Sequence, residues 1–191
     1  MHLLPVTTIS LDEGGEAVDL RQPPGEIVVL SFADSDLSAL AVAHGRSSPS
    51  APTLRLASLR RLRHPLSVDL YVEATAAKAQ FVLVRCLGGL DYWRYGLERL
   101  KAACSARGVK LAVLPGDDRP DPRLAGFATV PAALCDELEA YFRAGGVENL
   151  APLLGRIAAE IGRSAAPFEP PRPVPRAFAW TLAHGPEDPE T

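Results

Sequence analysis

Residues 81–118, FVLVRCLGGLDYWRYGLERLKAACSARGVKLAVLPGDD, contain a complete strand–turn–helix–strand unit. The apolar run Phe81–Val84 is typical of a strand that is covered on both faces. A second apolar run, Val109–Leu114, follows Gly108, which is a suitable C′ residue for the helix between the two strands. Two buried strands joined by a long helix indicate a right-handed parallel crossover, so we predict an α/β core.

The segment between these strands has the signals of a turn followed by an amphipathic helix. Gly88-Gly89 interrupts the first strand, and Asp91 is the predicted N-cap of the helix. Arg94 and Glu98 stand four residues apart, which predicts a solvated pair. Apolar residues recur at helical spacing on the opposite face: Trp93, Leu97, Leu100 and Cys104.

The residues before this unit predict strands and helices in alternation. Asp34 or Ser35 is expected to cap a short helix, and Pro65 is expected to open another. Three apolar runs are predicted strands: Leu3–Leu11 at an edge, Ile27–Leu30 and Leu54–Leu59. This order is typical of a doubly wound sheet in which helices cover both faces.

The residues after the unit predict two more helices and a tail. Pro131 begins one helix and Asn149 caps the next, so the helices within residues 131–162 complete a domain of residues 1–163. Residues 164–191 are rich in proline and predict an extended linker or a disordered tail. The predicted fold class is α/β, with a small, doubly wound, mostly parallel sheet of flavodoxin or Rossmann type and two extra C-terminal helices.

The composition argues against several classes of protein. The chain has 191 residues, 47% of them hydrophobic, which suits one domain with a tail. A net charge of −3 argues against a chain that binds nucleic acid as a whole. No apolar run approaches the roughly 20 residues of a membrane span, and the first residues do not resemble a signal peptide. Three widely spaced cysteines, expected to be small buried residues in a reducing compartment, indicate a cytoplasmic protein: Cys86, Cys104 and Cys135.

Several motifs of known chemistry do not occur in the sequence. It has no G-x-G-x-x-G and no Walker A loop, so we expect no nucleotide to be bound by the usual backbone cradle. It also lacks C-x-x-C and H-x-x-x-H, and its four histidines are scattered, so we expect no protein-made metal site and no bound cofactor. The acidic pocket of a receiver domain is only faintly resembled, because no lysine follows the last predicted strand.

The carboxyl ends of the predicted strands are where a ligand site is expected in a parallel α/β sheet. The loops at these ends are residues 31–34, 85–89 and 115–118. In and beside them lie the candidate ligand-binding residues: Arg85, Gly88, Gly89, Tyr92 and Trp93, with Asp34 and Asp117. A cation, two glycines that let a ligand approach the backbone, and aromatic rings suit a large planar anion.

The same residues also have a purely structural interpretation, and the two remain open. Trp93 has the spacing of a core residue, which favours the structural interpretation for this side chain. The glycines would then only form the turn, and Arg85 would pair with Asp34 or Asp117. Asp117 is itself a typical turn residue.

A basic patch lies between the second predicted strand and the helix that follows it. It consists of Arg60, Arg61, Arg63 and His64, with Arg55 nearby in sequence. Such a patch can bind the carboxylates of a ligand or the acidic face of a partner. A solvated edge without a ligand is the simpler interpretation, which the residue types favour.

Several segments, in order along the chain, resemble the N-terminal part of the large subunit of cobaltochelatase, which belongs with the H subunit of magnesium chelatase. They are MHLLPVTTISLD (1–12), IVVLSFADSDLSAL (27–40), LRLASLRRLRHPLSVDLYVE (54–73), VRCLGGLDYWRYG (84–96) and LAVLPGDDRPDPRLA (111–125). The resemblance extends from residue 1 to about residue 176 and does not include the final residues. Arg85, Gly88, Gly89, Tyr92 and Trp93 match a signature of that family.

The resemblance implies a role in the aerobic route to cobalamin. In that family, the whole enzyme inserts Co²⁺ into hydrogenobyrinic acid a,c-diamide and uses ATP with Mg²⁺. The large subunit holds the tetrapyrrole, and its partners are an AAA+ ATPase and companion subunits. Family members are much longer, so this chain is expected to contribute to tetrapyrrole enclosure or subunit contact and to be inactive alone.

Two functions of other classes are alternatives. A stand-alone α/β interaction module would use the arginine run to dock an acidic protein. A flavodoxin-like nucleotide binder is disfavoured, because the loop after Leu30 lacks a Ser/Thr- and Gly-rich phosphate pattern.

Overall fold

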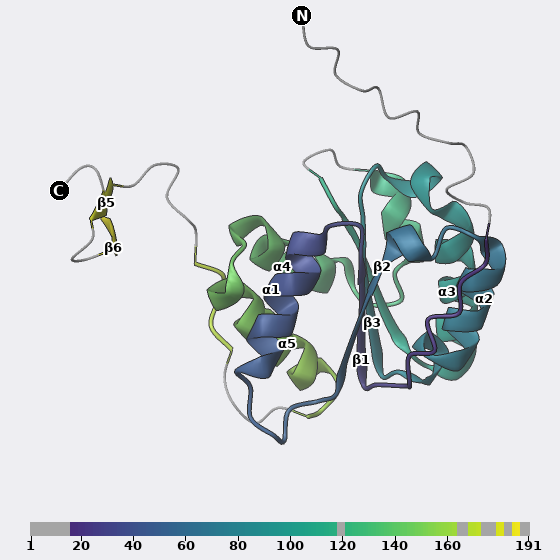
Figure 1. Ribbon diagram of the computed structural model, residues 1–191, viewed down its shortest axis with the longest axis horizontal. Coiled ribbons are helices and arrows are strands. Elements are labelled where there is room, and N and C mark those ends of the chain that lie inside the picture. Colours follow the sequence, from purple (N-terminus) through teal and green to yellow (C-terminus); the bar gives the residue numbers. More distant parts are fainter. Residues whose placement is uncertain (1–15, 118–120, 164–167, 173–178, 182–184, 188–191) are drawn as a thin grey trace, which may run out of the picture.

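Four parallel strands form one sheet in the order β2-β1-β3-β4 (Figure 1). They are β1 (Ile27–Ser31), β2 (Leu54–Ser58), β3 (Phe81–Cys86) and β4 (Lys110–Pro115). The computed structural model describes residues 16–117, 121–163, 168–172, 179–181 and 185–187, and the candidate strand Leu3–Leu11 lies outside these residues. The prediction of a small parallel α/β sheet is confirmed.

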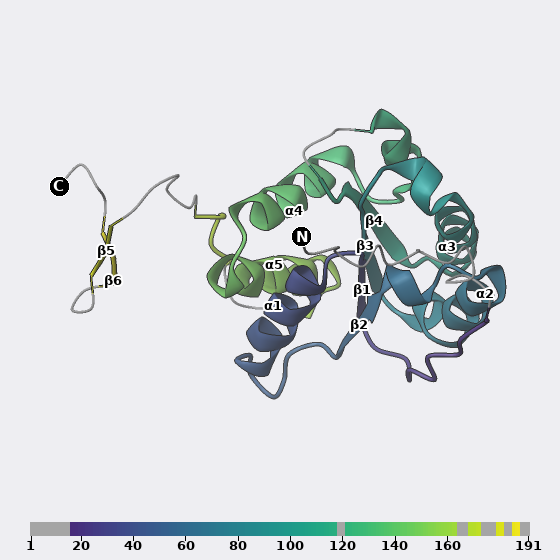
Figure 2. The same cartoon turned by 45° about the horizontal axis from the view of Figure 1, so that its top comes forward.

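Helices cover both faces of this sheet, which gives three layers (Figures 1 and 2). One face carries α1 (Asp34–Gly45), α4 (Ala132–Ala144) and α5 (Val147–Glu160), and the other carries α2 (Pro65–Ala74) and α3 (Arg94–Arg107). Short 3₁₀ helices lie in the connections: η1 (Leu59–Arg61), η2 (Ala76–Lys78), η3 (Leu90–Tyr92) and η4 (Pro122–Phe127). Within the described ranges, no helix combines the length and apolar character that a membrane crossing requires.

The alternation of side chains along β3 separates two hydrophobic cores. Val82 and Val84 pack with the residues of α2 and α3, whereas Phe81 and Leu83 pack with those of α1, α4 and α5. All four are fully buried, because both faces of a parallel sheet are covered by helices. Arg85 has the parity of Phe81 and Leu83, so its side chain leaves the sheet on the α1, α4 and α5 face.

Three predicted N-caps are wrong, because each residue lies inside a helix. Asp34 is the first residue of α1, and Asp91 lies in η3. The Asp91 carboxylate pairs with Arg94 at 2.7 Å, which replaces the predicted pair between Arg94 and Glu98. Asn149 lies within the first turn of α5 and is buried. Helices α1 and α5 begin one to three residues earlier than the capping pattern indicated, whereas α3 begins later, at Arg94, because η3 occupies the residues around Asp91.

Part of the proline-rich segment contacts the domain. The Tyr141 hydroxyl donates to the carbonyl of Glu169 at 2.6 Å. The side chain of Asn149 donates to the carbonyl of Arg172 and accepts from its N–H, at 3.1 and 2.7 Å. Residues 168–172 are thereby attached to α4 and α5. Farther along, two short strands pair antiparallel: β5 (Ala179–Thr181) and β6 (Gly185–Glu187).

The three cysteines differ in burial, which predicts their reactivity. Cys86 and Cys104 are buried, as predicted, and Cys135 is half-buried. Burial raises the pKa of the Cys86 thiol to about 12 and that of Cys104 to about 11, so both stay protonated at pH 8. We expect Cys135 to be the first to react with Ellman's reagent in the native protein, and all three to react after unfolding. Rapid reaction of a native Cys135→Ser variant would contradict this assignment.

Candidate functional site

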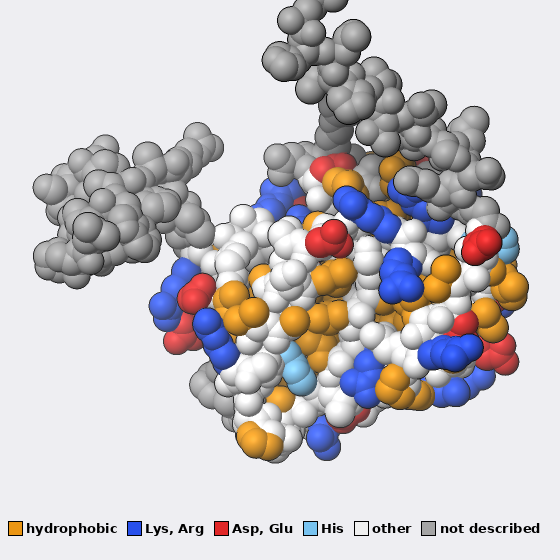
Figure 3. Space-filling model, viewed as in Figure 1, with side chains coloured by type: hydrophobic (Ala, Val, Ile, Leu, Met, Phe, Trp, Pro, Cys, Tyr) orange, Lys and Arg blue, Asp and Glu red, His pale blue; other side chains and the backbone are white. Residues whose placement is uncertain are grey.

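The order of the strands indicates where a ligand is expected at the carboxyl ends of the strands. The connection from β1 leads to β2 on one side, and β3 and β4 lie on the other side of β1. Ligands of doubly wound sheets bind at such a reversal, outside the carboxyl ends of the strands. Figure 3 shows Lys and Arg side chains interspersed with hydrophobic ones over the side of the molecule that faces the viewer in Figure 1.

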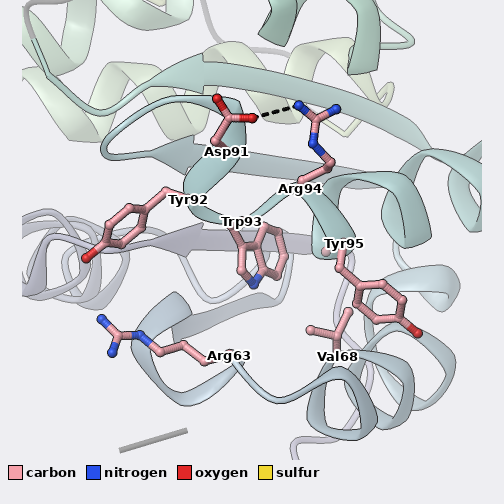
Figure 4. A pocket seen from close by; sticks show the side chains of 8 residues that line it. Arg63, Val68, Asp91, Tyr92, Trp93, Arg94 and Tyr95 are labelled. Atoms are coloured by element: carbon pink, nitrogen blue, oxygen red, sulfur yellow. Dashed lines mark hydrogen bonds and ion pairs between the residues drawn. The ribbon is translucent and has the colours of Figure 1, made fainter. Parts of the chain in front are cut away.

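Two adjoining hollows lie at the carboxyl ends of the strands; they share two lining residues and are described together as the two lobes of one hollow. The smaller lobe, of about 360 Å³, is called the basic lobe and is lined by Phe32, Arg60, Arg63, Leu87 and Tyr92. The larger lobe, of about 460 Å³, is called the mixed lobe and is lined by Arg63, Val68, Asp91, Tyr92, Trp93, Arg94, Tyr95 and Gly96 (Figure 4). Arg63 and Tyr92 line both lobes. The structure therefore brings together the basic patch and the turn after β3, which the sequence left as separate candidates.

Tyr92 forms an exposed aromatic platform between the two lobes. The residue is 57% exposed. Phe32 meets the ring edge-on, with centroids 5.2 Å apart and planes at 81°. Gly88 has φ +80°, and a Cβ added there would lie 3.1 Å from the Tyr92 ring, so glycine leaves the space in which the ring rests. Phe32 and Gly88 thus flank the Tyr92 ring, and the rest of the ring is exposed.

The arginines of the basic patch have no acidic partner among the residues that the structure describes. Within the described ranges, most other arginines form ion pairs, but the side chains of Arg60, Arg61 and Arg63 form no ion pair or hydrogen bond. The segment is anchored by Leu59 and Leu62, which are fully buried, while the three arginines are exposed. Arg60 and Arg63 therefore place two unneutralised charges on the lining of the hollow.

Two members of the predicted basic cluster have structural roles. The Nδ1 atom of His64 accepts a hydrogen bond from the N–H of Leu66 at 3.1 Å, so His64 is the N-cap of α2. Arg55 lies near the start of β2, at the opposite edge of the sheet from η1, and donates to the carbonyl of Pro23. Neither residue lines the hollow.

Trp93 is a core residue, as its spacing favoured. Its side chain is buried, and its Nε1–H donates to the carbonyl of Leu62 at 2.7 Å. This bond joins the start of α3 to the segment that carries Arg63. One part of the indole still forms a wall of the mixed lobe (Figure 4), so Trp93 can report on a bound ligand without binding it through a polar group.

The turn that presents Tyr92 is held by carboxylates from the loop after β4. Asp117 accepts from the N–H of Gly88 at 3.1 Å, and Asp121 accepts from the N–H of Leu90 at 2.9 Å. The Arg123 guanidinium and then the Leu90 N–H hold the pKa of Asp121 well below its usual range, so this carboxylate remains charged in mildly acidic solution. Asp117 thus supports the turn. Sequence reasoning missed Asp121, although an Asp directly before Pro122 is a helix-start signal.

Gly89 is required by the shape of this turn. Its φ is +75°, and an added Cβ would lie 2.7 Å from the Asp121 carboxylate oxygen. Gly89→Val should lower the free energy of unfolding by about 2–4 kcal/mol, because a β-branched residue is strained at positive φ and also displaces Asp121. Urea unfolding checks this value. Gly126→Val is the matched control, since nothing lies within 4 Å of its Cβ position, and an equal loss in both variants would contradict the explanation.

Arg85 does not belong to the hollow. Its Nη1 donates to both carboxylate oxygens of Asp36, at 2.7 and 2.8 Å, and its guanidinium lies 4.9 Å from the Phe142 ring. The predicted pairing with Asp34 or Asp117 is therefore wrong. Asp36 is the third residue of α1 and is mostly buried, whereas Asp34 is exposed. The candidate residues thus divide between the two faces of the sheet.

No group of three or more His, Cys, Asp or Glu side chains in the described residues is arranged to hold a metal ion. The polar chemistry that the hollow offers is guanidinium donors, one carboxylate and phenol groups around aromatic surface. These groups can bind and orient an anionic aromatic or macrocyclic ligand.

Comparison with known proteins identifies relatives over nearly the whole chain. No family model matches the sequence. The chain is 46% identical over 180 residues to the aerobic cobaltochelatase subunit CobN of a Sinorhizobium species, which covers 94% of this chain and 14% of that protein. It is 38% identical over 185 residues to CobN of Pseudomonas aeruginosa, which covers 96% of this chain and 15% of that protein.

A solved structure agrees with these relatives. The catalytic subunit of cobaltochelatase from Mycobacterium tuberculosis matches with a TM-score of 0.62 and 28% identity, over 80% of this chain and 12% of that one. The chain spans 14–15% of the length of the curated relatives. It therefore belongs to the family of the CobN subunit of aerobic cobaltochelatase and corresponds to a small part of that subunit.

Proposed function

We propose that this chain acts as an N-terminal module of the large subunit of aerobic cobaltochelatase and that its two-lobed hollow holds the tetrapyrrole. The reaction is the ATP-dependent insertion of Co²⁺ into hydrogenobyrinic acid a,c-diamide, in the cytoplasm. The relatives named cobaltochelatase support the reaction class. The expectation that the substrate is a large ring with several carboxylates comes from the family resemblance.

The observation that carries the proposal is the pair of unneutralised arginines beside an open aromatic ring. Arg60 and Arg63 line the basic lobe with Tyr92, and within the described part of the chain neither has an acidic partner. Guanidinium groups bind carboxylates through charge-assisted hydrogen bonds, and the Tyr92 ring offers apolar contact to the edge of a macrocycle. The chain has a net charge of −3, so a local excess of free arginine charge is a specific feature of this edge.

In this proposal, other parts of the complex handle the metal and the nucleotide. Co²⁺ and ATP with Mg²⁺ are substrates of the whole enzyme, and the AAA+ ATPase, the companion subunits and the rest of the large subunit complete the reaction. The isolated chain binds the tetrapyrrole but does not insert metal.

A fluorescence titration tests the proposal. The sequence has two tryptophans, so a Trp180→Phe background leaves Trp93 as the only one. Hydrogenobyrinic acid a,c-diamide should quench Trp93 emission saturably. The Arg60→Ala/Arg63→Ala variant should bind at least about tenfold more weakly, which corresponds to the loss of charge-assisted hydrogen bonds.

Arg61→Ala is the matched control, because Arg61 lies on the same 3₁₀ helix but lines neither lobe. It should leave the affinity within about twofold of the parent. Saturable quenching that survives in the double variant would exclude the arginines as the carboxylate site. No quenching up to about 100 μM would refute tetrapyrrole binding by this chain and favour the alternative, an interaction module whose arginines dock an acidic protein.

A further inference from the structure

The two lobes of the hollow differ in charge. Among the described residues, the basic lobe is lined by Arg60 and Arg63 and by no acidic side chain, whereas the mixed lobe contains Asp91 together with Arg94. Figure 4 shows Arg63 and the Asp91–Arg94 pair on opposite sides of the Trp93 indole. A ligand that spans both lobes therefore meets unpaired guanidinium groups at one end and the Asp91–Arg94 ion pair at the other.

Asp91 is held in place but keeps room for another donor. Its Oδ1 accepts from Arg94 at 2.7 Å, and its Oδ2 pairs with Arg123 at 2.9 Å. An ionised carboxylate has about four acceptor sites, so these two contacts orient the group and leave acceptor capacity on it. The side chain is 63% exposed, and hydrogen bonds from Arg94 and then Arg123 lower its pKa. Asp91 is therefore an oriented, charged acceptor in the wall of the mixed lobe.

We propose that Asp91 is a specificity-determining residue that selects a primary amide over a carboxylate on the ligand edge in the mixed lobe. This inference rests on the proposed function of the hollow. An amide N–H donates to the Asp91 carboxylate, whereas a ligand carboxylate at the same place is repelled by it. The ligand thus lies across Tyr92, with carboxylates toward Arg60 and an amide-bearing edge toward Asp91. A binding site that accepts a hydrogen bond discriminates against analogues that lack the donor.

The test compares two probes that differ only in amidation: hydrogenobyrinic acid and its a,c-diamide. In the Trp180→Phe background, the diamide should bind about tenfold more tightly, as expected for one hydrogen bond to a charged group. Asp91→Asn should reduce this ratio to within about twofold, mainly by tightening the binding of the acid. Asp136→Asn is the control, because it removes one exposed negative charge outside both lobes and should leave the ratio unchanged.

The outcomes separate this inference from the proposed function. Arg60→Ala should weaken both probes alike and preserve their ratio. If the arginines are required but Asp91→Asn leaves the ratio unchanged, the proposed function stands and the role of Asp91 is refuted. Equal binding of the two probes by the parent protein also refutes it. If neither probe binds, both the proposed function and the role of Asp91 are refuted.

Discussion

Arg85→Ala should lower the free energy of unfolding by about 3 kcal/mol, because it leaves the Asp36 carboxylate without its cation in a largely buried position. The two side chains are only 16% and 12% exposed. Asp36 also accepts from the Ser31 hydroxyl at 2.8 Å, so the charge is fixed between α1 and the ends of β1 and β3. The affinity of the hollow for a ligand should stay unchanged, because Arg85 lies on the other face of the sheet.

A double-mutant cycle in urea measures the pair directly. Asp36→Ala and the double variant complete the cycle, and the double variant should lose less stability than the sum of the two single losses. A coupling energy near zero would show that Arg85 and Asp36 do not stabilise each other. If Arg85→Ala weakened ligand binding without lowering the free energy of unfolding, Arg85 would be a ligand-binding residue after all.

Gly96→Ala is the second change with a large expected effect. An added Cβ would lie 2.2–2.5 Å from ring atoms of Trp93, which is closer than a carbon contact permits. The indole is buried and bonded to the carbonyl of Leu62, so it cannot move aside without losing that bond. We expect a loss of about 3 kcal/mol in the free energy of unfolding and a red-shifted Trp93 emission, because the ring is forced toward solvent.

Gly45→Ala provides the comparison within the same fold. Gly45 is also helical, but nothing lies within 4 Å of its Cβ position. This change should be neutral or stabilise the protein by up to about 1 kcal/mol, since alanine has the higher helix propensity. Equal effects of the two substitutions in urea unfolding would show that contact with Trp93 is not the cause.

Local patterns predicted the fold because the strands and helix faces are local features. The apolar runs at Ile27–Leu30 and Phe81–Val84 are buried strands, and Gly108 ends α3 at φ +68°, as expected for a C′ glycine. Helix starts were less accurate. Asp91 has a capping side chain, but the residues after the glycine turn first form η3, which shifts the start of α3 past it.

The site was harder to predict, because it depends on which side of the sheet each side chain leaves. Arg85 and Tyr92 are close in sequence, yet the parity of β3 directs Arg85 toward α1 and α4, while the turn carries Tyr92 to the other side. Tyr92 and Arg60 line the same lobe because of the order of the strands in the sheet, and this order cannot be read from any local sequence pattern.

The bonds that hold the turn before Tyr92 connect carboxylates to backbone N–H groups rather than to side chains. Such contacts do not depend on the side chain of an exposed turn residue, so Leu87 can be exchanged without loss of the turn's shape, whereas Gly89 cannot. The shape is specified instead by Asp117 and Asp121, which lie 29 and 31 residues after the groups they bind. A graft of residues 81–108 into another α/β protein would therefore include Tyr92 but lack Asp117 and Asp121, the two carboxylates that fix its position.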